Sequence, residues 1–191
     1  MKLALSRSRS ELLQVLMDKN STGPETAYWV FSNITQDRWE NLTILAPGFY
    51  GWEFNKTFGH YHSSSEKEVY RVAYGDGILV LQRKHLEGGQ VDYERVDQVI
   101  LIKATAGDEL IIPPEYGHSW SNVGMGPVLL LDNWRSGHQE ADYQPIAKQN
   151  GLAYFLTLAN GQITPIANPR YRDLPPPVWM STAQWRVQQS Y

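Results

Sequence analysis

The sequence predicts a mainly β protein that folds as a single domain. Its 191 residues match the size of one ordinary domain, and the content of 42% hydrophobic and 19% charged residues is typical of globular chains. From residue 27 onward, short runs rich in Tyr, Trp, Val, Ile and Thr alternate with turn signals. No repeat of solenoid or propeller type interrupts this pattern. Together these features favour an antiparallel sandwich or a small barrel.

The first 26 residues are expected to form one helix and a linker. Ser8 stands three residues before Glu11, which is the spacing of a capping box, and an apolar helical stripe begins at Leu12. Gly23 and Pro24 then end the helical pattern.

The barrel domain is predicted to span residues 27–171, with ten candidate strands. The candidate strands are residues 27–34, 40–46, 52–62, 68–74, 77–83, 90–96, 98–104, 108–113, 118–124 and 127–134. Residues 172–191 follow as a tail that contains three consecutive prolines and two tryptophans. Because proline disfavours regular structure, we expect an extended tail that packs on another surface, with a subunit contact as one possibility.

The composition excludes several classes of function. The net charge is −3 and no run of Lys or Arg is present, so nucleic acid is not an expected partner. The longest apolar runs have strand length, and no membrane span or signal peptide is predicted, so we expect a cytoplasmic protein. With no cysteine, a metal site would need nitrogen and oxygen ligands.

Two histidines form the first candidate for chemistry. His60 and His62 are two residues apart, so on a strand both imidazoles project from one face. A straight strand would carry Glu68 about 20 Å away, but a turn at Ser63–Ser65 could return it to the histidines.

A third imidazole is available from His118, which follows a tight loop. Three imidazoles and one carboxylate suit one divalent transition metal, whether Fe, Mn, Ni, Co or Zn, and would leave coordination positions open for a substrate. The competing interpretation is that Glu68 is a solvated charge and His118 a hydrogen-bonded loop residue.

The spacing of these residues resembles the two motifs of the cupin superfamily. Six residues separate Glu68 from Gly75, and five residues separate Gly107 from Pro113. Two departures stand out. The general motif would select Glu66 as the acidic ligand, and Glu115 occupies a position where glycine is usual. The resemblance implies a double-stranded β-helix, or jelly-roll barrel, and Glu66 stays open as a rival ligand.

More narrowly, the chain resembles the cupin-type glucose-6-phosphate isomerases. The segments LTILAPG, KTFGHYH, EVYRVAYGDGILVLQ, PPEYGHSWSNVG, ADYQPIAKQNG and NPRY carry this likeness in the same order. In that family the acidic ligand follows a longer gap, which favours Glu68. The resemblance implies isomerisation of glucose 6-phosphate to fructose 6-phosphate and a homodimer. It implies metal ligands at His60, His62, Glu68 and His118, a sugar-phosphate subsite at Thr43, Thr57, Gly59 and Tyr70, and catalytic roles for Glu68 and Tyr70.

The subsite requires an irregular backbone. On a regular strand Thr57 and Gly59 would face away from His60 and His62, so we expect a β-bulge near Gly59 that turns both pairs into one cavity.

The roles of several further aromatic and histidine residues follow less directly from the sequence. The family pattern tends to carry a Tyr-Pro near Trp134 and a histidine where this chain has Ala141, so Trp134 is expected to form an apolar wall. His138 could replace the missing histidine, although a surface position is the preferred interpretation, and His85 is assigned to the surface. Tyr116 could orient a substrate hydroxyl or serve in packing. These departures keep two alternatives open, a non-catalytic sugar-binding cupin and an iron-dependent cupin dioxygenase.

Overall fold

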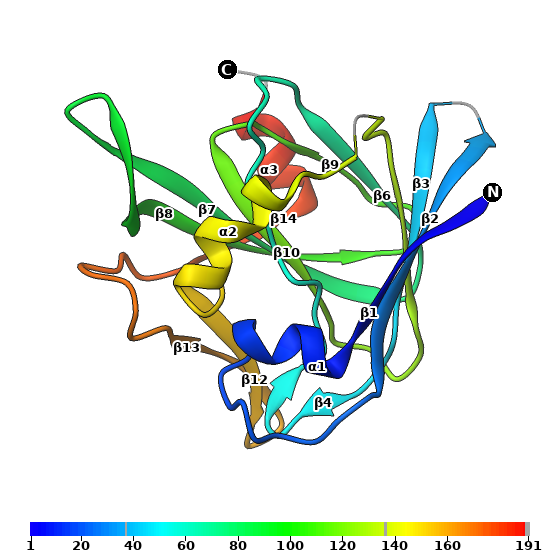
Figure 1. Ribbon diagram of the computed structural model, residues 1–191, viewed down its shortest axis with the longest axis horizontal. Coiled ribbons are helices and arrows are strands. Elements are labelled where there is room, and N and C mark those ends of the chain that lie inside the picture. The colour runs from blue at the N-terminus through cyan, green and yellow to red at the C-terminus, as the bar shows by residue number, and fades with distance from the viewer. Residues whose placement is uncertain (37, 136, 190–191) are drawn as a thin grey trace.

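The fold is mainly β, as the sequence predicts, and the strands of the described residues form three sheets (Figure 1). The computed structural model describes residues 1–36, 38–135 and 137–189. In the six-stranded sheet the order is β1-β2-β3-β11-β6-β9. Its strands are β1 (Lys2–Ser8), β2 (Thr26–Gln36), β3 (Trp39–Leu45), β11 (Val128–Asp132), β6 (Glu68–Tyr74) and β9 (Glu109–Ile112).

Two four-stranded sheets complete the β structure. The first has the order β10-β7-β8-β14, with β10 (Tyr116–Asn122), β7 (Asp76–Glu87), β8 (Gln90–Thr105) and β14 (Val178–Ser181). The second has the order β13-β12-β5-β4, with β13 (Gln162–Ala167), β12 (Tyr154–Ala159), β5 (Glu53–Phe54) and β4 (Phe49–Tyr50). The described helical segments are α1 (Arg9–Leu12), the 3-10 turn η1 (Leu13–Val15), α2 (Glu140–Lys148) and α3 (Thr182–Gln188).

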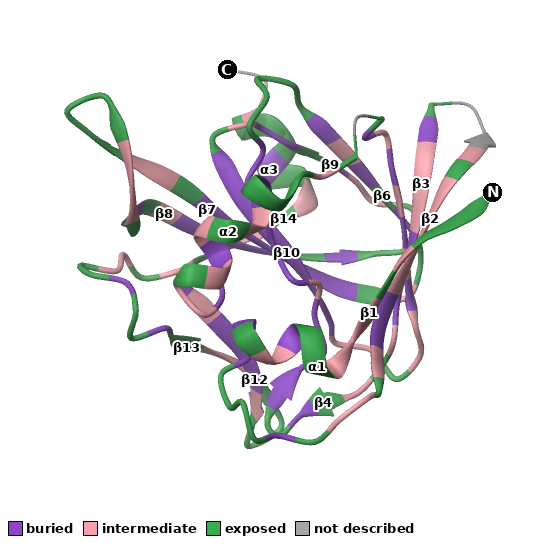
Figure 2. Cartoon of the chain, in the orientation of Figure 1, coloured by how far each residue is buried: buried purple, intermediate pink, exposed green. Residues whose placement is uncertain are grey.

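Strands β7 and β8 form the central hairpin of the core. Leu79 and Ile102 belong to one cluster of buried side chains, whereas Ile78 and Leu101 belong to another. Both faces of this sheet are therefore covered, which explains why its strands read as continuous apolar runs instead of alternating. The far end of the hairpin projects from the body and is exposed, as the green segments of Figure 2 show.

The predicted N-terminal helix is present but short. The Ser8 side chain accepts a hydrogen bond from the Glu11 backbone N–H, as the capping box requires. The chain becomes extended again at Leu16, after only α1 and η1. Strand β1 was not predicted. Its sequence has only a weak strand pattern, and the strand forms because it pairs antiparallel with β2.

Several predicted strands also differ from the observed ones. Residues 90–96 and 98–104 form the single strand β8, because Asp97 continues the extended chain and does not turn it. Residues 52–62 are strand only at Glu53–Phe54, with isolated bridges at Lys56 and His60. Helix α2 and strands β12 and β13 lie in a region where no element was predicted.

The C-terminal tail leaves the barrel in extended form and then returns to it. Strand β14 adds to the edge of β8 in parallel, and α3 follows, a helix that was not predicted. Trp185 of α3 is fully buried, and its indole N–H donates to the Ile111 carbonyl at 2.8 Å. The tail therefore packs on its own barrel. Across the part of the chain that is described, no helix has the length and hydropathy needed to span a bilayer.

Candidate metal centre

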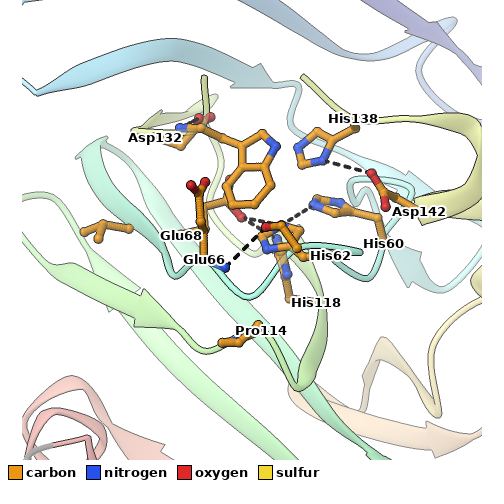
Figure 3. A network of polar contacts seen from close by, with 12 residues as sticks. His60, His62, Glu66, Glu68, Pro114, His118, Asp132, His138 and Asp142 are labelled. Carbon is orange, nitrogen blue, oxygen red and sulfur yellow. Dashed lines mark hydrogen bonds and ion pairs between the residues drawn. The ribbon is translucent and has the colours of Figure 1, made fainter. Parts of the chain in front are cut away.

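Four side chains from three separate stretches of the chain converge inside the barrel. His60 and His62 lie on the irregular segment after β5, Glu68 is the first residue of β6, and His118 lies in β10. The exposed residues between His62 and Glu68 let the chain reverse, as the sequence predicts. Figure 3 shows the three imidazoles gathered at one point, with His138 and Asp142 beside them.

A bulge at Gly59 positions the two histidines. Lys56 pairs with Ser121 whereas His60 pairs with His118, so the 56–60 side contains one residue more than its partner strand. Gly59 has a φ of +84°, and a Cβ there would lie 3.0 Å from Leu152 Cδ1. Only glycine fits this left-handed and crowded position comfortably. The predicted bulge is therefore present.

The candidate ligand atoms are close enough to share one ion. Glu68 Oε2 lies 3.0 Å from His118 Nε2 and 3.2 Å from His62 Nε2. His60 Nε2 lies 3.1 Å from His62 Nε2. One ligand atom from each of the four residues can be chosen so that all lie within 4.8 Å of one another. Distances of this size are compatible with bonds of about 2 Å to a common cation.

Burial and the contacts between these side chains set three of them, His60, His118 and Glu68, to the protonation states that metal ligands need. All four side chains are buried, and Glu68 has no exposed surface. Burial, followed by the neighbouring imidazoles, lowers the pKa of His60 well below its usual value. Burial also lowers the pKa of His118, against the opposing effect of Glu68. Burial alone would raise the pKa of Glu68, but contacts with His118 and His62 outweigh it and hold that pKa well below its usual range. His60 and His118 are therefore neutral and Glu68 is charged near neutral pH.

Several buried nitrogen and oxygen atoms of these side chains lack a hydrogen-bond partner, which also fits a metal site. Both Glu68 carboxylate oxygens and His118 Nε2 are buried without a properly oriented hydrogen bond from any described residue. A buried carboxylate left in this state is costly unless a cation completes its environment. Since the donors are nitrogen and oxygen, the four residues could hold a divalent transition metal.

Glu66, the rival acidic ligand, lies outside the centre. Its side chain is exposed on the turn before β6, and its backbone N–H donates to Ser64 Oγ at 3.3 Å. The structure therefore favours Glu68 over Glu66 as the acidic member of the cluster.

A cavity of about 590 Å³ opens onto this cluster. Thr43, Thr57, Gly59 and Tyr70, the four residues expected to contact a sugar phosphate, all line it together with His60 and His118. Thr57 Oγ1 accepts from the Trp120 backbone N–H at 3.0 Å, which orients its hydroxyl. Burial, then the charges of Glu68 and Asp132, raise the pKa of Tyr70 well above its usual value, so the phenol keeps its proton. The volume is in the range of small-molecule sites.

Two residues with uncertain sequence assignments are walls of the cavity. Trp134 stacks on His62 with ring centroids 4.0 Å apart, as expected of an apolar wall. His138 was preferred as a surface residue, and this assignment is wrong: its ring lies 3.9 Å from that of His60 and lines the cavity. Burial lowers the pKa of His138 to about 4. Its distance in sequence from the other histidines concealed this role.

The remaining assignments have mixed outcomes. Tyr116 does not line the cavity; its hydroxyl donates to Gln98 at 2.9 Å and its ring packs against Trp185. His85 is at the surface, as expected, with Nδ1 2.7 Å from Asp97 Oδ1.

Sequence patterns missed the charged residues that line the cavity, among them Asp132 and Arg7. Asp132 Oδ1 accepts from Asn41 Nδ2 at 2.6 Å and from the Trp134 N–H at 3.0 Å. Burial, with the charge of Glu68, raises the Asp132 pKa to about 7. Its position at the end of an apolar strand was the one sequence feature that could have identified Asp132 as a cavity residue. Arg7 belongs to β1, a strand that was itself not predicted.

Comparisons with known proteins agree with this geometry. Residues 26–172 match the family described as glucose-6-phosphate isomerase (GPI). A glucose-6-phosphate isomerase from Pyrococcus abyssi is 32% identical over 134 residues, which cover 69% of this chain and 63% of the relative. One from Thermococcus litoralis is 32% identical over 133 residues, covering 68% and 62%. The chain thus spans somewhat less than two thirds of the length of these relatives.

Similarity to solved structures is weaker. An oxalate decarboxylase-like protein from Thermotoga maritima has a TM-score of 0.40 and 14% identity, over 69% of this chain and 90% of that one. The family match, by contrast, covers most of the sequence and includes all four candidate metal ligands. On that match, this chain is a member of the glucose-6-phosphate isomerase family.

Proposed function

We propose that this protein is a metal-dependent aldose–ketose isomerase that interconverts glucose 6-phosphate and fructose 6-phosphate, a step of glycolysis and gluconeogenesis. The observation that carries the proposal is the convergence of His60, His62, Glu68 and His118, with ligand atoms within 4.8 Å of one another, at a cavity of about 590 Å³. The family membership supplies the substrate class. A cytoplasmic location and a homodimer remain predictions that accompany this function.

The four clustered residues would hold one divalent transition metal, with Fe, Mn, Ni, Co and Zn as candidates. When bound, such an ion supplies Lewis acidity that stabilises negative charge on substrate oxygens. The neutral imidazoles of His60 and His118 and the ionised Glu68 are in the protonation states that this role requires.

The other cavity residues would bind and orient the substrate. Thr43 and Thr57 offer hydroxyls for the phosphate, and Gly59 lies beside them in the cavity lining, where its backbone N–H is the group it can offer. Tyr70 keeps its proton and can donate a hydrogen bond to a sugar oxygen. Trp134 and His138 cover the sugar end and restrict the entry of water.

Glu68 is the proposed base. Its carboxylate would take the proton from C2 of the open-chain aldose and return it to C1, while the hydroxyl proton passes from O2 to O1. Direct transfer of hydrogen from C2 to C1 is the rival route, and the low pKa of Glu68 weakens it as a base. Turnover in D2O separates the two: solvent deuterium at C1 of fructose 6-phosphate supports the proton route, and full retention of the original hydrogen contradicts it.

The proposal is tested by an isomerase assay on purified protein. Chelation is expected to abolish conversion of fructose 6-phosphate to glucose 6-phosphate, and re-addition of one metal at a time is expected to restore it. No turnover with any of the five metals would overturn the enzymatic proposal. Stabilisation by sugar phosphate without turnover would indicate the sugar-binding alternative, and oxygen consumption would indicate the dioxygenase.

A further inference from the structure

Strand β1 completes the cavity from outside the segment that matches the family. The match begins at residue 26, whereas β1 covers Lys2–Ser8 and lies along the outer edge of β2 (Figure 1). Arg7 of β1 pairs with Tyr28 of β2, and both residues line the cavity. A residue that the family comparison does not reach therefore contributes a positive charge to the candidate site.

The Arg7 guanidinium is held by two aromatic rings. Its Cζ lies 5.2 Å from the centroid of Phe58 and 5.7 Å from that of Tyr143. Only 16% of the side chain is exposed. Such stacking fixes the plane of the guanidinium. The guanidinium also shares a hydrogen bond with the Tyr28 side chain, and its remaining N–H groups can bind a ligand.

The charge of Arg7 is only weakly compensated within the chain. The ion pair that the structure gives it joins Nη1 to Glu11 Oε1 at 3.6 Å, and the Glu11 side chain is 47% exposed. The Arg7 Nε is buried and receives no hydrogen-bond acceptor from the described residues. A buried donor without an acceptor in the chain is open to an acceptor from a ligand or from water.

Arg135, which also lines the cavity among the described residues, differs from Arg7 in its exposure. Arg135 is 76% exposed, and its Nε lies 3.7 Å from Glu40 Oε2. Each arginine thus has one carboxylate at a similar distance, and burial is what separates them: the solvated Arg135 gains less from an anion than the largely buried Arg7.

The position of Arg7 identifies the kind of anion. The Phe58 ring under its guanidinium belongs to the residue between Thr57 and Gly59, two of the residues assigned to the phosphate subsite. We propose that Arg7 is a specificity-determining residue that binds the substrate's phosphate group through its guanidinium and so selects phosphorylated over unphosphorylated sugars. The proposal rests on the proposed function, which supplies both the sugar and the phosphate subsite at Thr57 and Gly59.

The planar guanidinium is suited to this role. Its parallel N–H groups can donate to two oxygens of a phosphate dianion at once, which a lysine ammonium cannot reproduce. Loss of such a charge-assisted interaction lowers affinity about ten- to hundredfold.

Binding of inorganic phosphate, measured by calorimetry, provides a test that does not require turnover. Arg7→Met and Arg7→Gln are expected to weaken phosphate binding about ten- to hundredfold, and Arg7→Lys to give an intermediate loss. Arg9→Met is the matched control, because Arg9 contacts the Ser21 carbonyl and Glu25 and does not line the cavity. It should bind phosphate as the wild type does.

Isomerase kinetics provide the second readout. In Arg7→Met the KM for fructose 6-phosphate should rise by the same factor as the phosphate Kd, while binding of unphosphorylated fructose should not change. Unchanged phosphate affinity in a folded Arg7→Met or Arg7→Gln protein would overturn the proposal. If both neutral variants fail to fold, Arg7→Lys decides, since unchanged phosphate affinity there contradicts the need for a guanidinium.

The two proposals can fail separately. A wild-type protein without isomerase activity whose phosphate binding depends on Arg7 would refute the proposed function and support the role of Arg7. An active isomerase whose phosphate affinity and KM are unchanged in Arg7→Met and Arg7→Gln would support the proposed function and refute the role of Arg7.

Discussion

Glu66 and Glu68 stand two residues apart but in opposite environments. Glu66 is exposed on the turn, whereas Glu68 is fully buried against His62 and His118. Residues two positions apart in an extended chain normally share a face. The difference in burial between Glu66 and Glu68 therefore comes from the turn, on which Glu66 lies, and not from their spacing.

Removing the charge of Glu68 should therefore cost far more than removing that of Glu66. We expect Glu68→Gln to lower isomerase activity by more than about a hundredfold and to reduce bound metal, because an anionic ligand is lost. Glu66→Gln is the matched control and should retain both. Metal content by mass spectrometry and initial rates measure the two effects, and equal losses in both variants would contradict the assignment of Glu68.

Asp132 introduces a pH dependence of its own. Burial raises its pKa from 3.8 to about 7, so between these values the folded state holds a proton that the unfolded state has released. The folded protein binds more protons in that window, and the contribution of Asp132 to the free energy of unfolding therefore decreases as pH rises from about 4 to about 7. Above about pH 7 the carboxyl is ionised in both states, and the full free-energy cost of burying its charge is present.

Asp132→Asn should remove this penalty while its carbonyl oxygen still accepts from Asn41 and the Trp134 N–H. In the metal-free protein we expect the variant to gain stability relative to the wild type at pH 8 and to show no such gain at pH 4. Urea unfolding at both values measures the difference. A gain of the same size at both pH values would show that ionisation of Asp132 is not its cause.

At the level of elements, a buried ion pair joins the N-terminal segment to the barrel. Lys56 donates from Nζ to the Val15 carbonyl at 2.6 Å, and Glu53 accepts from the Met17 N–H at 2.8 Å. The two side chains also form an ion pair, and Glu53 is 1% exposed. The segment after α1 is thus bonded to two charged side chains that are buried away from water.

Lys56→Met should destabilise the protein by about 3–5 kcal/mol, because it leaves Glu53 buried without a cation. Glu53→Gln combined with Lys56→Met should cost less than the sum of the single changes, since the orphaned charge is removed. Lys19→Met is a control, because Lys19 bonds Asn150 at the surface. Additive single and double costs in urea unfolding would contradict this coupling.

Elements with a strong local pattern were predicted well. Residues 68–74 coincide with β6, and the capping box at Ser8 marks the start of α1. Elements that depend on a distant partner were missed: β1 exists through its pairing with β2, and β14 through its parallel pairing with β8. Residues 52–62 read as a strand, but the extra residue at Gly59 interrupts the pairing.

On the scale of the whole molecule, the candidate ligands tie together parts of the chain that are distant in sequence. Glu68 begins a strand of the six-stranded sheet, and His118 lies in the sheet formed by β7, β8, β10 and β14. A shared ion would hold the two sheets together, so metal binding should stabilise the entire fold.

Divalent metal is therefore expected to raise the melting temperature of the chelated protein, with a stabilisation of about 2.7 kcal/mol at a metal concentration of 100 times Kd. His118→Ala should lose this response. His85→Ala should keep it, because His85 pairs with Asp97 at the surface. Thermal unfolding with and without metal measures the effect, and an equal response in both variants would place the metal elsewhere.

The sequence by itself determined the β class, the single-domain size, the absence of thiolate ligands and the candidate ligand set, because these follow from composition, short-range pattern and motif spacing. Only the tertiary structure decided between Glu66 and Glu68, turned His138 into the cavity and added Arg7 of β1 to its lining. Burial and proximity depend on how distant segments pack, and local spacing carries no information about packing between elements that are far apart in the chain.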